Sequence, residues 1–243
     1  MLTTSVVPLA LDIIIKDEII VSLASCMTQL YWFCISSYFQ NFLIAAMSFD
    51  RYLAVCNPLR YSSLMNSHVF LQMIIGFWII VFLLESSEIL VICQFKFCGL
   101  DYIDHFFCDF GPILQMSTSD ISGLMLQDLV ISIAVIFLPF VFVIVTYIFI
   151  VVTILQISTS YGRSKGFSTC SSHLAMVCTY YGSLMLVYMA PSDPSSDSMN
   201  KYRSLLYIVV SPLMNPILYS LRNQEIKRAL QKCIGSFKAV SRI

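Results

Sequence analysis

Residues 124–155 read LMLQDLVISIAVIFLPFVFVIVTYIFIVVTIL, an apolar run whose one charged residue is Asp128. A bilayer core is about 30 Å thick and needs about 20 apolar residues, because each residue of a helix adds about 1.5 Å. An unpaired backbone amide in hydrocarbon costs several kcal/mol, so a segment that crosses a membrane must be helical. The run therefore predicts a membrane-spanning α-helix.

The rest of the chain repeats this pattern. The 243 residues are 58% hydrophobic and 12% charged, against about 25% charged in soluble proteins. We therefore expect an all-α integral membrane helix bundle that forms one domain over residues 1–243. A shorter apolar piece, Met1 to Ile15, is interrupted by Pro8 and Asp12 and predicts only the remnant of a span. The other expected spans are Ser25–Ser48, Val69–Ile92, Ser172–Met189 and Leu205–Leu221, which makes five in all.

The basic residues predict the orientation of these spans. Ten of the 14 Lys and Arg residues fall in one alternating set of connecting segments and the C-terminal tail, and four fall in the other set. Positive residues favour the cytoplasmic side. We therefore expect a cytoplasmic C-terminus, with the residues before Ser25 on the opposite side. The formal net charge is zero, which gives no reason to expect a nucleic-acid partner.

Four motifs carry a resemblance to a known family. Residues 47–61 read MSFDRYLAVCNPLRY, residues 165–174 read KGFSTCSSHL, and residues 212–223 read PLMNPILYSLRN. The loop after Val69–Ile92 contains FCG and IDHFFCD, the second over residues 103–109. In sequence and order these motifs resemble the odorant receptors of the rhodopsin-like G-protein-coupled class.

The resemblance implies a rhodopsin-like bundle whose five spans correspond to family helices three to seven. Residues 1–11 then correspond to the end of helix two, and we expect helix one and most of helix two to be lacking. The implied function is to bind a small volatile or water-borne odorant within the bundle. The implied partner is a heterotrimeric G protein of the olfactory Gs type, which signals through cAMP. No cofactor is implied.

Other function classes fit less well. The sequence contains no P-loop, no GxSxG and no HExxH motif, and its three histidines form no obvious catalytic set, so we expect no enzyme activity. A membrane transporter is one alternative, although the chain shows no repeat and no charge near the expected span centres. A non-signalling receptor fragment is the other alternative. We expect a multi-pass plasma-membrane protein, or one retained in the endoplasmic reticulum if the chain is truncated.

The expected activation site lies where the first full span meets the cytoplasm. Asp50 and Arg51 are adjacent opposite charges that can pair, and Pro216 removes a backbone donor and kinks the last span. The competing interpretation of Arg51 is a simple topology anchor. By resemblance, Tyr147 and Tyr219 meet near Arg51 on activation. The predicted coupling and activation residues are Asp50, Arg51, Tyr52, Tyr147, Asn215, Pro216 and Tyr219.

The expected ligand site lies among the outer halves of the spans. Spacing of three to four residues places the candidates of the first span on one helical face. Glu85 and Glu88 also share a face, and we expect them to reach water at the outer end of their span. The alternative is a role in binding a cationic or hydrogen-bonding ligand. The predicted ligand-binding residues are Phe33, Cys34, Ser37, Tyr38, Tyr181, Leu184, Tyr188, Leu205 and Ile208.

By resemblance, Cys26 forms a disulfide with Cys108 and holds the long loop over the ligand site. Cys98 is then free or pairs with Cys93. His105, Cys108 and Asp109 suggest a metal site, but a disulfide sulfur is a poor ligand, so we predict none.

The C-terminal tail predicts one more helix. Residues 224–238 place an apolar stripe beside a basic face, which is typical of an amphipathic helix on the cytoplasmic leaflet of a lipid bilayer.

Overall fold

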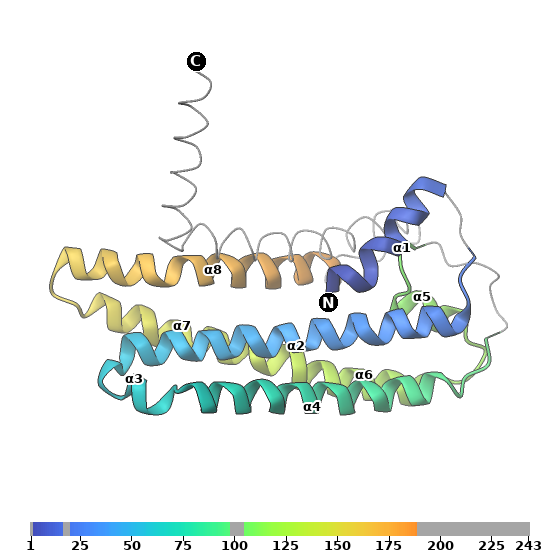
Figure 1. Cartoon of the computed structure of the whole chain (residues 1–243), viewed down its shortest axis with the longest axis horizontal. Helices are drawn as coiled ribbons and strands as arrows, with labels where there is room; N and C mark the ends of the chain where they lie inside the picture. Colours follow the sequence, from blue (N-terminus) through green and yellow to red (C-terminus); the bar gives the residue numbers. More distant parts are fainter. Residues whose placement is uncertain (1, 17–19, 98–104, 189–243) are drawn as a thin grey trace, which may run out of the picture.

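The computed structural model describes residues 2–16, 20–97 and 105–188, and these residues form a bundle of helices. Figure 1 shows the long rods of the bundle lying side by side. No strand occurs in these three ranges, where the nearest feature is an isolated bridge between Phe97 and Ser117. The all-α membrane bundle predicted from the sequence is therefore confirmed. The elements are α1 (Leu2–Lys16), α2 (Leu23–Cys56), α3 (Pro58–Leu64), α4 (Ser67–Ile92), α5 (Phe110–Gln115), α6 (Ser122–Ser132), η1 (Ile133–Phe137), α7 (Leu138–Leu155) and α8 (Ser160–Tyr188).

Helix α2 is the centre of the described bundle, because it packs against α1, α4, α7 and α8. Its first turn is capped by Ser22, whose side chain accepts a hydrogen bond of 3.2 Å from the N–H of Ser25. The helix ends at Cys56, two residues before Pro58, which lacks a backbone N–H. The helix continues past Ser48, where the span was expected to end, because a helix can extend beyond the apolar stretch that crosses a membrane.

Helices α4 and α6–η1–α7 provide the apolar outer surface. Both are long and apolar enough to cross a membrane, with mean hydropathies of 2.2 and 3.0. Large apolar side chains such as Leu83 and Leu126 are more than half exposed. Contiguous apolar surface of this extent marks a surface that other apolar groups must cover, and here lipid provides the cover.

Helices α2 and α8 do not reach this hydropathy among the described residues, although spans were expected in both. Polar residues of α2 such as Asn41 and Ser48 explain the difference, because they are buried against other helices and do not face lipid. Helix α8 also begins at Ser160, well before the expected Ser172, with the exposed Arg163 and Lys165 in its first turns.

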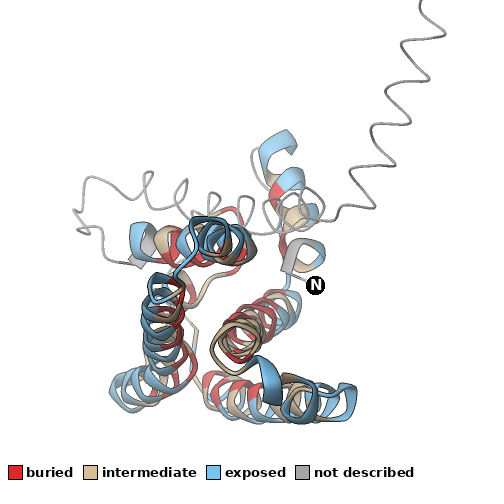
Figure 2. Ribbon diagram, turned by 90° about the vertical axis from the view of Figure 1, so that its left-hand side faces the viewer, coloured by how far each residue is buried: buried red, intermediate tan, exposed pale blue. Residues whose placement is uncertain are grey.

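The run 124–155 is not one uniform α-helix. Its middle turn, η1, is a π-helix over Ile133–Phe137, and the rod continues directly into α7 with Pro139 near its start. Such wide turns are rare and occur frequently at functional sites. Figure 2 shows that buried residues lie on the sides of the helices that face one another, while exposed residues face outward.

Candidate functional site

The helices border a cavity of about 770 Å³, here called the main cavity. It lies between α2, α4, α6, η1, α7 and α8, and the loop residues around α5 contribute to its wall. Six residues that the sequence predicted for ligand binding line this cavity: Phe33, Cys34, Ser37, Tyr38, Tyr181 and Leu184. The four residues on α2 lie on one face of the helix, as their spacing predicted. That they bind a ligand stays a prediction.

Three predicted ligand residues are not placed at this cavity. The side chain of Tyr188, at the end of α8, is outside what the structure describes, and so are Leu205 and Ile208. The roles of these three residues also stay predictions.

The main cavity has an acidic wall, which the sequence supported only as the alternative interpretation of Glu85 and Glu88. Glu85 and Glu88 line it and are 1% and 3% exposed, so the expectation that they reach water was wrong. The reason is that α6 packs against α4 at this level, where Gln127 donates a hydrogen bond of 3.0 Å to Ser87. Asp128 of α6 also lines the cavity.

Several polar atoms around the main cavity have no hydrogen-bond partner. They are Oδ1 of Asn41, Oε1 of Glu85, Oε1 of Glu88 and the hydroxyl of Tyr181, and all four residues line the main cavity. A buried polar atom without a partner costs about 1–3 kcal/mol. The four atoms therefore indicate a site that a hydrogen-bonding ligand can complete.

A disulfide joins the loop above the cavity to α2. Cys26 and Cys108 are bonded at an S–S distance of 2.00 Å, which confirms the predicted pair. The N–H of Cys108 also donates to Oε1 of Gln29 at 2.9 Å, and the ring of Phe107 lies 5.2 Å from that of Phe33. These contacts hold the loop against the cavity end of α2.

The same loop places Asp109 at the start of α5. Its carboxylate accepts a hydrogen bond of 2.9 Å from the N–H of Phe110, and it also lines the main cavity. Burial raises the pKa of Asp109, while the positive charge of His105 and that hydrogen bond act in the opposite direction. Within the described ranges no group of three His, Cys, Asp or Glu side chains is placed to hold a metal ion. Cys93 is a free, exposed thiol, and the prediction for Cys98 lies outside the described residues.

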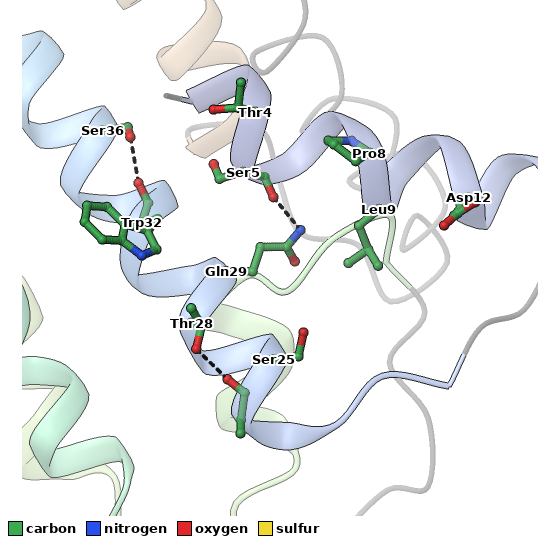
Figure 3. A pocket seen from close by; sticks show the side chains of 11 residues that line it. Thr4, Ser5, Pro8, Leu9, Asp12, Ser25, Thr28, Gln29, Trp32 and Ser36 are labelled. Carbon is green, nitrogen blue, oxygen red and sulfur yellow. Dashed lines mark hydrogen bonds between the residues drawn. The ribbon is translucent and has the colours of Figure 1, made fainter.

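A second concavity, of about 870 Å³, lies between α1 and α2 (Figure 3). Its hydroxyl groups are largely occupied within their own helix, since Ser36 donates to the carbonyl of Trp32 at 2.7 Å and Thr28 to that of Ala24 at 2.8 Å. Gln29 is bonded as well, because its amide donates to the carbonyl of Ser5 at 2.9 Å. With its polar groups paired, this groove is a weaker candidate for a ligand site than the main cavity.

The opposite end of α2 carries the predicted coupling residues. Nη2 of Arg51 lies 3.1 Å from Oδ2 of Asp50, and the two side chains are 34% and 19% exposed. Tyr61 of α3, which the predicted coupling set omitted, donates a hydrogen bond of 2.8 Å to Oδ1 of Asp50. This bond to a carboxylate raises the pKa of the Tyr61 hydroxyl. Tyr52 packs against α7, with its ring centre 6.0 Å from that of Phe149.

Tyr147 is buried at the contact between α7 and α8. Its hydroxyl lies 2.6 Å from Nδ1 of His173, and the two rings are stacked with their centres 5.7 Å apart. Asn215, Pro216 and Tyr219 are outside the described residues, so the expected contact between Tyr147 and Tyr219 stays a prediction. The helix predicted over residues 224–238 is outside them as well.

Comparison with known proteins agrees with this arrangement. The family model described as olfactory receptor matches residues 1–236. The human olfactory receptor 10A7 is 39% identical over 235 residues, which are 96% of this chain and 73% of that protein. The mouse olfactory receptor 5P68 is 38% identical over 233 residues, 96% of this chain and 74% of that protein. The family model and these relatives match nearly the whole length of this helical bundle, and we conclude that this chain belongs to the olfactory receptor family.

Proposed function

We propose that this chain is an odorant receptor that binds a small odorant in the main cavity and activates a G protein at the Arg51 end. One observation carries the proposal: six residues predicted for ligand binding line a single cavity of about 770 Å³. This volume lies within the range of about 300–1,000 Å³ that is typical of small-molecule sites. The proposed G protein is of the olfactory Gs type, and the proposed signal is cAMP.

Helix α2 supplies a route from the ligand to the G protein. Residues near its start, such as Phe33, line the main cavity, and the same helix ends beside the Asp50–Arg51 ion pair. A ligand shifts a conformational equilibrium only by binding one state more tightly than the other. In the proposed mechanism, the bound odorant favours a packing of α2, α7 and α8 in which Arg51 leaves Asp50 and contacts the G protein.

The test is a cAMP assay with a panel of odorants on cells that express the chain, together with its Arg51→Ala variant. We expect ligand-dependent cAMP from the chain, and none from Arg51→Ala, while ligand binding is retained. Arg60→Ala is the matched control, because Arg60 is exposed and forms no ion pair among the described residues. Uptake of ligand without any cAMP response would contradict the proposal and favour a transporter.

We also propose that Arg51 and the C-terminal tail lie on the cytoplasmic side of the plasma membrane. The excess of Lys and Arg in the segments of that set supports this orientation. Protease protection of epitope tags, one in the α3 segment and one after residue 243, tests it. Cleavage of the two tags from opposite sides of the membrane would contradict it.

A further inference from the structure

One wall of the main cavity is acidic. Glu85 and Glu88 come from the last turns of α4, and Asp128 comes from α6 beside it. Oε1 of Glu85 and Oε1 of Glu88 are buried and have no hydrogen-bond partner. No Lys, Arg or His occurs among the described residues that line this cavity. Charged carboxyl groups inside a membrane protein are costly unless they are paired, so a positively charged ligand group at this wall would be stabilised by Glu85 and Glu88.

Two other helices supply further unpaired polar atoms at the cavity. Asn41 of α2 and Tyr181 of α8 are 1% and 5% exposed, and both line the cavity. Oδ1 of Asn41 and the hydroxyl of Tyr181 are also without a partner. The amide nitrogen of Asn41 is already used, because it donates to the carbonyl of Ser37 at 3.1 Å. The free atom of Asn41 is therefore an acceptor, and it matches a ligand that donates hydrogen bonds.

The rest of the lining restricts what such a cation can be. No three acidic, His or Cys side chains of the described chain are arranged to hold a metal ion. Most other lining residues are apolar or aromatic, among them Phe33, Ile136, Phe140 and Leu184. A site of this kind fits an organic molecule with a charged donor at one end and an apolar body at the other.

An ammonium group meets these conditions. It is positively charged, it donates up to three N–H hydrogen bonds, and it accepts none. We propose that the main cavity binds an apolar amine in its protonated form, with the ammonium held at the wall made by Glu85 and Glu88 and the apolar body against the aromatic side. This inference rests on the proposed function, because it assigns a ligand class to the same cavity.

The test is equilibrium binding to the full chain reconstituted in lipid nanodiscs, with three probes that share one six-carbon body: hexylamine, hexanol and hexanoic acid. Competition against radiolabelled hexylamine gives the affinities. We expect hexylamine to bind at least about tenfold more tightly than hexanol, and hexanoic acid to bind most weakly, because like charges placed together repel. Equal affinity for hexylamine and hexanol would overturn the inference.

Variants locate the ammonium. Glu85→Gln keeps the shape of the side chain and removes its charge, and we expect hexylamine affinity to fall about thirtyfold while hexanol affinity is unchanged. Glu85→Asp keeps the charge and retains part of the affinity for the amine. Asp12→Asn is the matched control, because Asp12 is exposed, pairs with Lys16 at 3.4 Å and lies outside the main cavity. A loss of hexylamine binding in Asp12→Asn equal to that in Glu85→Gln would overturn the assignment.

The outcomes separate this inference from the proposed function. Hexylamine that binds through Glu85 but raises no cAMP supports the amine site and contradicts the proposed signalling. Hexanol that binds and raises cAMP, while hexylamine does neither, supports the receptor and overturns the amine site.

Discussion

The two ends of α2 are built differently. At the end near Cys26, the helix borders a cavity of about 770 Å³ whose wall contains polar atoms without partners. Toward the end near Arg51, its polar groups are paired: Ser48 with Thr146, Cys56 with Thr153 at 3.2 Å, and Asp50 with both Arg51 and Tyr61. One helix thus joins a hollow region to a packed one.

The difference shows which region can accept a ligand and which region contributes most to the free energy of unfolding. Unpaired polar atoms cost stability, so a region that contains them is either a site or a defect. Close-packed regions respond to changes of even one methylene group. We therefore expect substitutions at the Cys26 end to change binding, and substitutions at the Arg51 end to change stability and signalling.

The largest effect is expected from removing a side chain in the packed region. Ile150 of α7 is 1% exposed in the core shared by α2, α7 and α8, and Ile150→Ala should lower the free energy of unfolding by about 2–5 kcal/mol. Ile136→Ala is the control, because Ile136 already borders the main cavity and its loss creates little new empty space. Thermal denaturation in detergent measures both. Equal losses would show that the two regions do not differ in packing.

The second-largest loss in the free energy of unfolding is expected from removing the disulfide above the cavity. Cys26→Ser removes the bond to Cys108, and such bonds typically contribute about 2–4 kcal/mol. The loop would then hold the cavity less firmly, so we expect ligand affinity to fall together with the denaturation temperature. Cys93→Ser is the matched control, since Cys93 is a free and exposed thiol. Unchanged affinity in Cys26→Ser would show that the loop does not shape the site.

A smaller effect is expected from the buried hydrogen bond between α2 and α7. Ser48 is 0% exposed and bonds Thr146, and interhelical bonds of this kind in membranes contribute about 0.6 kcal/mol on average. A double-mutant cycle with Ser48→Ala and Thr146→Val isolates the coupling between the two side chains. A coupling energy near zero would show that the hydrogen bond between Ser48 and Thr146 does not stabilise the packed region.

The smallest change in stability is expected at Tyr61. Its hydroxyl donates to Asp50 near the surface, and exposed polar pairs contribute less than about 1 kcal/mol. Tyr61→Phe should leave the denaturation temperature nearly unchanged. Asp50 would hold Arg51 less firmly, however, so basal cAMP should rise in a cell assay. A rise in Asp50→Asn but not in Tyr61→Phe would mean that the hydroxyl does not restrain Arg51.

Hydropathy and spacing predicted much of this architecture. The spans expected at 69–92 and 124–155 begin within a few residues of α4 and α6, because lipid selects apolar residues along the whole crossing. Six cavity residues followed from spacing of three to four on neighbouring helices and from the family resemblance. The disulfide partner came from the resemblance, and the structure confirms it.

Features that depend on contacts between helices could not be predicted. The burial of Glu85 and Glu88 follows from α6 packing beside α4, which the order of residues along α4 does not reveal. The end of α2 at Cys56 also could not be predicted, because hydropathy marks the apolar stretch and a helix can continue beyond it. Asp128 offered a signal that was not used: a lone acid within an apolar run indicates a functional position.

The π-turn η1 has a consequence for how this rod can change. In a regular helix, one inserted residue rotates everything beyond it by about 100° and would turn every later side chain away from its neighbour. A π-turn accommodates one such extra residue, so the side chains before it and those after it keep their neighbours with a fixed offset in register. Asp128 and Ser132 can thus be aimed at the cavity while Thr146 keeps its contact with Ser48. Loss of the extra residue from this turn would therefore rotate the cavity face of the rod relative to its contacts at the Arg51 end.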